Sequence, residues 1–322
     1  MKQNAGAAST SIRSDGANKN ILTAGLFVPE QIQNGKSLSV LNQEYLEAHG
    51  NTPAAGEYGF SEVTIGKYMG AAREGAELGW WVDTDTVLPT NEQAADFVGT
   101  FRHELGHALG ISLKKGEYKV GGVTYQTIHP DVTENSWSLH LMDQTGKMAK
   151  PGMVIATSNN IPAGRTENDC FIVDRTIAAN GNGYAYFVGP NVTDALGGAT
   201  FFGRNALPVN GWETTFEGSH LQTTGMMSHR VYSNYTSFME VELAVMQDLG
   251  YKIDRKAYFG KSIYGNGGTI TNTQGYFARN RNGTAYLENT YSAVPLGIGL
   301  HIYGSDNMVT QAANIMTRGT GA

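Results

Sequence analysis

The pentapeptide His103-Glu104-Leu105-Gly106-His107 has the residue types and the spacing of a zinc site that activates water. Residues four apart lie on one face of a helix, so both imidazoles would reach a single metal ion. Glu104 lies beside that face, where a carboxylate contacts metal-bound water without itself coordinating. Zinc lowers the pKa of such water to roughly 7, and Glu104 would accept its proton as a general base. The motif therefore predicts a hydrolytic zinc centre.

A helix from residue 91 to 109 is predicted to carry this motif. Thr90 and Gln93 form a capping-box pattern at its start, and Gly110 is a natural helix end. The apolar stripe of this helix consists of Phe97, Phe101, Leu105 and Ala108. The motif is short enough to occur by chance as two surface histidines in unrelated chains. Its position on a capped amphipathic helix favours the metal site.

Residues 103–110 read HExxHxxG, which resembles the metzincin clan of zinc peptidases. The usual spacing of that clan places a third histidine ligand at position 113, where this chain has Leu113. The leishmanolysin-like branch tolerates a long insertion before that histidine. The segment EGSHLQTTGMMSH is similar to the closing element of this branch, and the resemblance implies His220 as the third ligand. It also implies Met227 as the methionine beneath the metal, with Met226 one position away.

The resemblance extends from about residue 79 to 251, because SFMEVELAVMQDLGY is similar to the family's C-terminal helix. The sequence itself predicts this helix from Ser237, with Glu240 completing a capping box and Gly250 ending the helix. In several metzincins a tyrosine stands near the metal two residues after the methionine. Here that position is His229, which would either stabilise the tetrahedral oxyanion or face solvent.

Other ligands for the third position stay open at this stage. His129 and His140 lie in the insertion near acidic residues, but neither is followed by a methionine element. A gluzincin-type site would take Glu240 or Glu242 from the later helix instead. Each acid also has an interpretation without a metal: Glu240 completes the capping box, and Glu242 is a solvated position on the helix. Cys170 is a further metal-binding side chain, but its FIVD context favours burial in a strand.

Composition narrows the class of protein. The chain has 322 residues with 41 glycines and only 16% charged residues, which is typical of a turn-rich, β-leaning extracellular chain. The formal charge of −6 argues against nucleic-acid and anionic-membrane partners. No apolar run approaches the roughly 20 residues of a transmembrane segment. The first 16 residues lack the apolar core of a secretory signal, so the protein is either not exported by this route or its signal is absent here. We expect a secreted or bacterial cell-surface protein.

The expected fold class is α+β, a metzincin-like catalytic domain at residues 21–255 behind a flexible segment at 1–20. A helix is predicted at 37–49, and residues 111–219 form a β-rich insertion of many short strands. By the resemblance, residues 61–83 would supply the edge strand on which an extended peptide pairs.

Residues 256–322 alternate short strands with Gly, Asn and Asp turns, which is typical of the first rungs of a β-solenoid. The segment GLHIYGSDNMVTQAANI resembles the start of bacterial autotransporter passengers. Calcium is a secondary candidate ion, at Asp83 and Asp85 or in the turns near Asn266 and Asp306. Turn chemistry explains these residues equally well.

These observations predict a zinc-dependent endopeptidase acting on protein or peptide substrates, with no oligomeric state specified. The rival prediction is a non-catalytic, adhesin-like β-stalk protein whose zinc is structural. A structural zinc site is closed by a fourth protein ligand, whereas a catalytic site keeps one position open.

Overall fold

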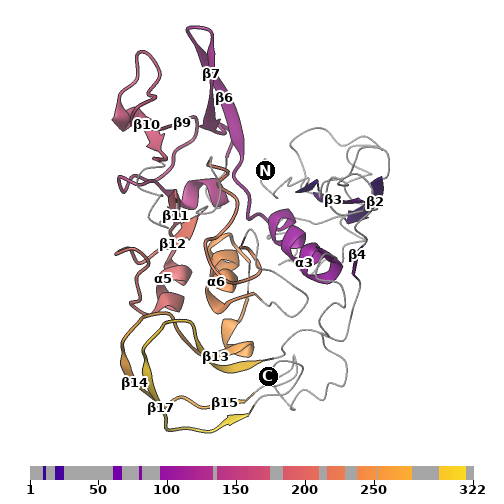
Figure 1. Cartoon of the computed structure of the whole chain (residues 1–322), viewed down its shortest axis with the longest axis vertical. Helices are drawn as coiled ribbons and strands as arrows, with labels where there is room; N and C mark the ends of the chain where they lie inside the picture. Colours follow the sequence, from indigo (N-terminus) through magenta and orange to yellow (C-terminus); the bar gives the residue numbers. More distant parts are fainter. Residues whose placement is uncertain are drawn as a thin grey trace.

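The computed structural model describes the chain almost continuously from residue 95, together with four strands that precede it. The described ranges are 10–11, 19–24, 61–66, 80–81, 95–132, 136–174, 184–209, 216–228, 238–251, 253–277 and 297–316. Within them the protein is a mixed α/β structure with few helices and several small sheets (Figure 1). The predicted helix 37–49, Asp83, Asp85 and His229 lie outside the described residues.

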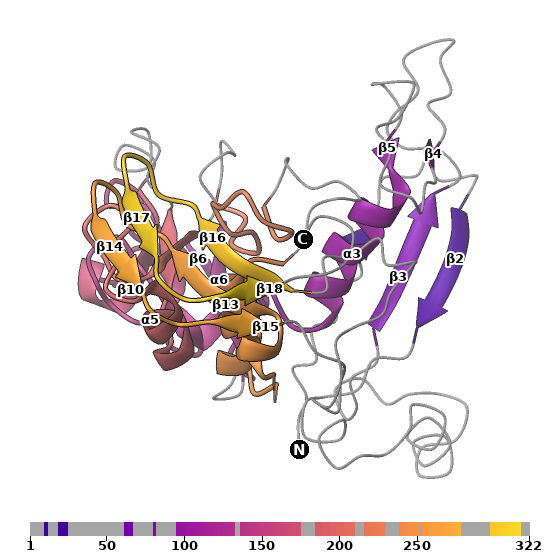
Figure 2. The ribbon, with the colours of Figure 1, turned by 90° about the horizontal axis from the view of Figure 1, so that it is seen from below.

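The N-terminal strands form a sheet that contacts the metal-motif helix. Strands β1 (Thr10–Ser11), β3 (Ser61–Gly66) and β2 (Lys19–Ala24) lie in the order β1-β3-β2. Helix α3 (Phe97–Ala108) contacts β1 and β3, and Figure 2 shows this helix beside the sheet. Because β3 lies between β1 and β2, residues 61–66 are not an edge strand of this sheet, and an edge for substrate elsewhere in residues 61–83 stays a prediction.

Helix α3 begins six residues later than predicted. Residues 95–96 form strand β5 (Ala95–Asp96), which pairs in parallel with β4 (Trp80–Trp81). This pairing joins segments about fifteen positions apart, and residues in extended conformation cannot also start a helix. Local capping patterns carry no information about such a partner.

The predicted β-rich insertion at 111–219 is built from two sheets. The first has the order β10-β9-β7-β6, and it contains β6 (Lys115–Val120), β7 (Val123–Ile128), β9 (Val154–Ala156) and β10 (Cys170–Ile172). The second has the order β12-β11-β8, and it contains β8 (Leu141–Met142), β11 (Ala185–Phe187) and β12 (Leu207–Val209). Gly121 and Gly122 join β6 to β7 with φ of 58° and 78°, the positive angles that a two-residue type I′ hairpin requires.

Two helices pack together beneath these sheets. Helix α5 (Pro190–Leu196) contacts helix α6 (Glu240–Asp248). The Asp248 carboxylate accepts hydrogen bonds from the backbone N–H groups of Asn191 (2.9 Å) and Val192 (3.0 Å), and so caps α5 from the end of α6. Short 3-10 helices complete the region: η1 (Trp137–His140), η2 (Glu167–Asp169) and η3 (Arg255–Ala257).

The start of α6 also differs from the prediction. Its N-cap residue is Met239, and the carboxylate that accepts the Met239 N–H at 2.9 Å belongs to Glu242. Glu240, the acid predicted to complete the capping box, instead accepts a hydrogen bond from Arg255 Nη1 at 3.1 Å. Because Glu242 is fully buried, its interpretation as a solvated helix position is wrong.

The C-terminal residues make two passes that lie side by side. The first pass contains β13 (Phe259–Ile263), β14 (Thr269–Asn272) and β15 (Tyr276–Phe277). The second contains β16 (Ile298–Ile302), β17 (Met308–Gln311) and β18 (Ile315–Met316). All three pairs are parallel, and each strand begins opposite a residue 39 positions later, an offset that the Asn272–Gln311 side-chain hydrogen bond of 2.7 Å shares.

One hydrophobic core links the insertion to the helices. It joins Trp137 and Phe187 from the insertion to Met227 and to Val241 and Val245 of α6, all buried. Cys170 lies in a separate small cluster on the four-stranded sheet, buried and away from the histidines, as its strand context predicts. Among the described residues, no helix has the length and apolar character needed to cross a bilayer.

Candidate metal centre

Helix α3 presents two histidines on its buried face. His103 is 2% exposed and His107 is 5% exposed, and their ring planes lie nearly perpendicular at 88°. Four residues correspond to slightly more than one helical turn, so both side chains leave the helix in similar directions. Glu104, which follows His103, is also buried at 9% exposure. The helix ends where Gly110 adopts a φ of 119°, a conformation that side chains rarely allow.

His220 reaches this helix because the sequence Gly-Ser-His returns to the residues after α3. Ser219 Oγ accepts the N–H of Leu113 at 3.0 Å, and Trp137 Nε1 donates to Gly218 O at 2.8 Å. Gly218 has a φ of 86°, and a Cβ there would lie 2.5 Å from Leu113 Cδ2. Leu113, at the position of the third histidine in the compact metzincin pattern, is therefore a core residue that supports the neighbour of His220.

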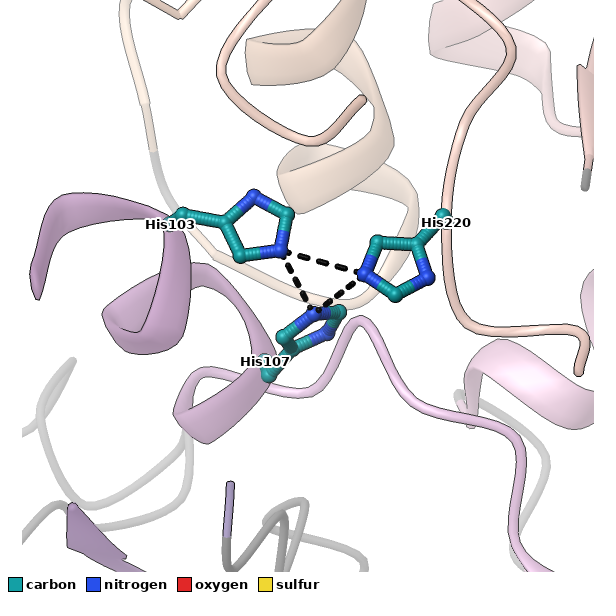
Figure 3. Close-up of side chains that lie close together, drawn as sticks. All are labelled: His103, His107 and His220. Atoms are coloured by element: carbon teal, nitrogen blue, oxygen red, sulfur yellow. Dashed lines mark hydrogen bonds between the residues drawn. The ribbon is translucent and has the colours of Figure 1, made fainter. Parts of the chain in front are cut away.

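The three imidazoles converge through their Nε2 atoms (Figure 3). The Nε2 atoms of His103 and His107 are 3.0 Å apart, and each lies 3.1 Å from Nε2 of His220. Nitrogen ligands about 2.0–2.1 Å from a tetrahedral zinc lie roughly 3.3–3.4 Å apart. The observed triangle is within a few tenths of an ångström of that geometry, so this group is close enough to bind one metal ion.

The outer nitrogen of each helix histidine faces a main-chain acceptor. His103 Nδ1 lies 2.6 Å from Met226 O, and His107 Nδ1 lies 2.7 Å from Ile111 O. A carbonyl oxygen only accepts hydrogen bonds, so both Nδ1 atoms carry a proton. In its neutral form each of these rings presents its Nε2 lone pair to the triangle, where that lone pair can bind a metal ion.

Glu217 provides the equivalent contact for the third ring. Its Oε2 lies 2.8 Å from His220 Nδ1 and also accepts the Ser219 N–H at 2.9 Å. Burial alone would raise the pKa of Glu217, but the His220 hydrogen bond and charge, together with Ser219, lower that pKa to about 2. A carboxylate that holds a ligating histidine fixes its tautomer and increases its basicity. Glu217 was not predicted as part of the site, although the sequence EGSH places it three residues before His220.

Met226 and Met227 contact helix α3 and its first histidine from within the core. Both are fully buried, and a Cβ at Gly106 would lie 2.1 Å from Met227 Sδ. The Met227 side chain therefore packs directly on α3 between the two histidines, which explains the glycine within the motif. Met226 contributes its carbonyl to His103. Met227 therefore lies against helix α3, which carries His103 and His107.

The rival ligands lie elsewhere in the described structure. His129 Nδ1 accepts the Asp131 N–H at 3.1 Å, and His140 Nδ1 contacts Val188 O at 2.9 Å while its ring stacks on Phe187. In the described ranges, the group of His, Cys, Asp or Glu side chains suited to a metal is formed by His103, His107 and His220. Asn266, a candidate calcium ligand, accepts the Ser305 N–H at 2.7 Å as a turn residue.

Comparison of the chain with protein-family models, with curated proteins and with solved structures finds no match.

Proposed function

We propose that this protein is a zinc-dependent endopeptidase whose metal ligands are His103, His107 and His220. The observation that supports it best is the convergence of three imidazole Nε2 atoms within 3.1 Å of one another. Each ring is held from behind by an acceptor at its Nδ1. Such outer contacts are typical of metal-ligating histidines.

The donor set favours zinc over other common ions. Neutral imidazoles suit zinc, whereas calcium and magnesium prefer carboxylate and carbonyl oxygens. Three protein ligands leave a fourth tetrahedral position, which is the arrangement of catalytic rather than structural zinc. His220 keeps 12% of its side-chain surface exposed, so this side of the centre is not sealed from solvent.

Glu104 is the side chain that we assign to proton transfer. When bound at this centre, zinc supplies a Lewis acid that polarises a peptide carbonyl and lowers the pKa of a water molecule to about 7. Glu104 accepts the proton of that water and returns it to the departing amine. This assignment rests on its position beside His103 in helix α3 and on the burial of its side chain.

We further propose a metzincin-like catalytic unit followed by the first coils of a β-solenoid. The HExxHxxG helix, the long insertion and the methionine beneath the histidines support a metzincin-like catalytic unit of the leishmanolysin type. The common 39-position offset of the C-terminal pairs supports two coils of a β-solenoid, joined by the Asn272–Gln311 side-chain contact. Protein or peptide substrates follow from the hydrolytic centre.

The test compares the unaltered chain with Glu104→Gln, and with Glu117→Gln as a matched control on an exposed side chain. We expect one zinc per chain in all three and cleavage of an unfolded protein that a chelator abolishes. Glu104→Gln should lower the rate about 10²–10⁴-fold at unchanged zinc content, as expected for loss of a general base. Stoichiometric zinc without cleavage in the unaltered chain would favour the β-stalk protein with structural zinc.

A further inference from the structure

The carboxylate of Glu242 is buried beneath the metal centre and is surrounded by hydrogen-bond donors. Oε2 accepts the N–H groups of Met226 (3.0 Å) and Met239 (2.9 Å). Oε1 accepts the N–H of Met227 at 2.9 Å and the hydroxyl of Thr223 at 3.2 Å. Three of these four donors are main-chain N–H groups, which have no acceptor capacity. The arrangement therefore fits the ionised carboxylate.

Two opposing effects act on this group. Burial raises the pKa of Glu242 to about 7, while the hydrogen bonds from Met239, Met227, Met226 and Thr223 favour the ionised form. Separating the Glu242 carboxylate from these donors would cost free energy, because a buried charge and several buried N–H groups would lose their hydrogen bonds. The helix and the turn are thus bound to each other through one side chain.

The residues that Glu242 holds are those that contact the ligands. Met226 accepts the His103 Nδ1 proton at its carbonyl, 2.6 Å away, and the Met227 side chain lies against Gly106 between the two helix ligands. Met227 O accepts the N–H of Leu221, the residue after His220, at 2.9 Å. One carboxylate therefore fixes the main chain through which both metal-binding segments are aligned.

The local sequence is adapted to this contact. Gly225 begins the turn, and a Cβ there would lie 2.4 Å from Glu242 Oε2, so any side chain would displace the carboxylate. The other two acids of α6 have different partners, because Glu240 pairs with Arg255 and Asp248 caps α5. Of these three acids, Glu242 is the one that faces the metal centre.

We propose that Glu242 is a positioning residue of the metal centre. By holding the main chain at 226–227, it sets the orientation of the His103 ring and the position of the Met227 side chain against helix α3. This inference rests on metal binding by the three histidines, which is part of the proposed function. It makes helix α6, 137 positions beyond His103 at its first residue, a determinant of metal affinity. Glu242 touches neither the metal position nor the substrate position in this assignment.

The experiment measures zinc affinity by competition with a chromophoric chelator, in Glu242→Ala, Glu242→Gln and a matched control. The control is Tyr264→Phe, which removes a buried acceptor for the Val241 N–H (3.0 Å) at the same end of α6 without touching the turn. We expect zinc dissociation constants to rise about 10-fold or more for Glu242→Ala, the lower end of the range for outer-shell partners. Glu242→Gln should show a smaller rise, because one amide oxygen still accepts.

A spectroscopic measurement separates positioning from general stability. The visible absorption of bound Co²⁺ reports the geometry of the ligands, so it should change in Glu242→Ala and not in Tyr264→Phe. If Glu242→Ala does not fold, Thr223→Val serves instead, because it removes one of the four donors with little change of shape. It should also raise the zinc dissociation constant.

Three results would overturn the inference. One is a zinc affinity within about twofold of the unaltered chain in the folded Glu242 variants, or in Thr223→Val where those variants do not fold. Another is an equal loss in Glu242→Ala and Tyr264→Phe. The third is an unaltered chain that binds no zinc, which rejects the proposed function as well. If the unaltered chain binds zinc and is active, but substitution of Glu242 leaves the zinc affinity unchanged, only the positioning role is rejected.

Discussion

Gly106→Ala is the substitution that most directly tests the packing beneath the metal centre. The added Cβ would lie 2.1 Å from Met227 Sδ and 2.9 Å from Met227 Cε. Ordinary contacts between such atoms need about 3.5–4.0 Å, so the sulfur has to retreat by roughly 1.5 Å. Met227 is fully buried and its carbonyl accepts the N–H of Leu221, so the retreat has to move neighbouring core side chains or the main chain at 227.

The expected magnitudes separate stability from metal binding. Alanine in a helix interior is favoured over glycine by about 1 kcal/mol, whereas overpacking of a core costs about 1–3 kcal/mol. The free energy of unfolding of the metal-free chain should therefore fall by no more than about 2 kcal/mol. The turn that carries Met226 O would shift away from His103, and zinc affinity should fall about 10–100-fold, the range for disturbed outer-shell partners.

The assay is a double-mutant cycle of Gly106→Ala and Met227→Ala, read by zinc competition and by denaturant unfolding of the metal-free chain. Met227→Ala alone opens a cavity and should cost about 2–5 kcal/mol of stability. In the double variant the methyl group added at position 106 partly fills that cavity, so the losses should be less than additive by about 0.5–3 kcal/mol. Unchanged zinc affinity in Gly106→Ala, together with additive losses, would refute the close contact.

Two further predictions concern Glu217. Glu217→Ala removes the acceptor of His220 Nδ1 and should weaken zinc about 10–100-fold, as a titration against a competing chelator would show; Glu117→Ala should have no effect. Because the folded pKa of Glu217 is lowered from 4.5 to about 2, its contribution to stability is complete above pH 4.5 and is lost as the pH falls towards 2. Unfolding of the metal-free chain across this range should be less pH-dependent in Glu217→Gln, and identical slopes would contradict this.

The sequence predicted several parts of the fold that depend on local patterns. Short strands were predicted throughout residues 111–219, and the strands at 154–156, 170–172 and 185–187 agree with that, because each is a short apolar run between turn residues. The β6–β7 hairpin was not predicted, although its Gly121–Gly122 turn is a local pattern. The order of these strands in the sheets was not predicted, since it depends on contacts between distant segments.

The candidate site also combines residues that local sequence predicts with contacts that it does not. His103, Glu104 and His107 were predicted from a motif of five residues, and His220 from the resemblance of the segment around it to a metzincin closing element. The acceptors Met226 O and Ile111 O are main-chain atoms, which no residue type identifies in advance. Glu242 was interpreted as a solvated helix position because its immediate neighbours are compatible with one. Its burial arises from the turn at 226–227, which lies 15 positions away in the sequence.

The long insertion is itself part of the metal centre. Ile111 and Leu113 begin it, and they supply the acceptor for His107 and the N–H that holds Ser219. Trp137 lies within it and donates to Gly218, so the insertion holds both residues that precede His220. His220 reaches the helix only when the residues between them have folded, because 113 positions separate it from His107. Packing within the insertion therefore determines the third ligand, and substitutions in its core should act on metal affinity through this route.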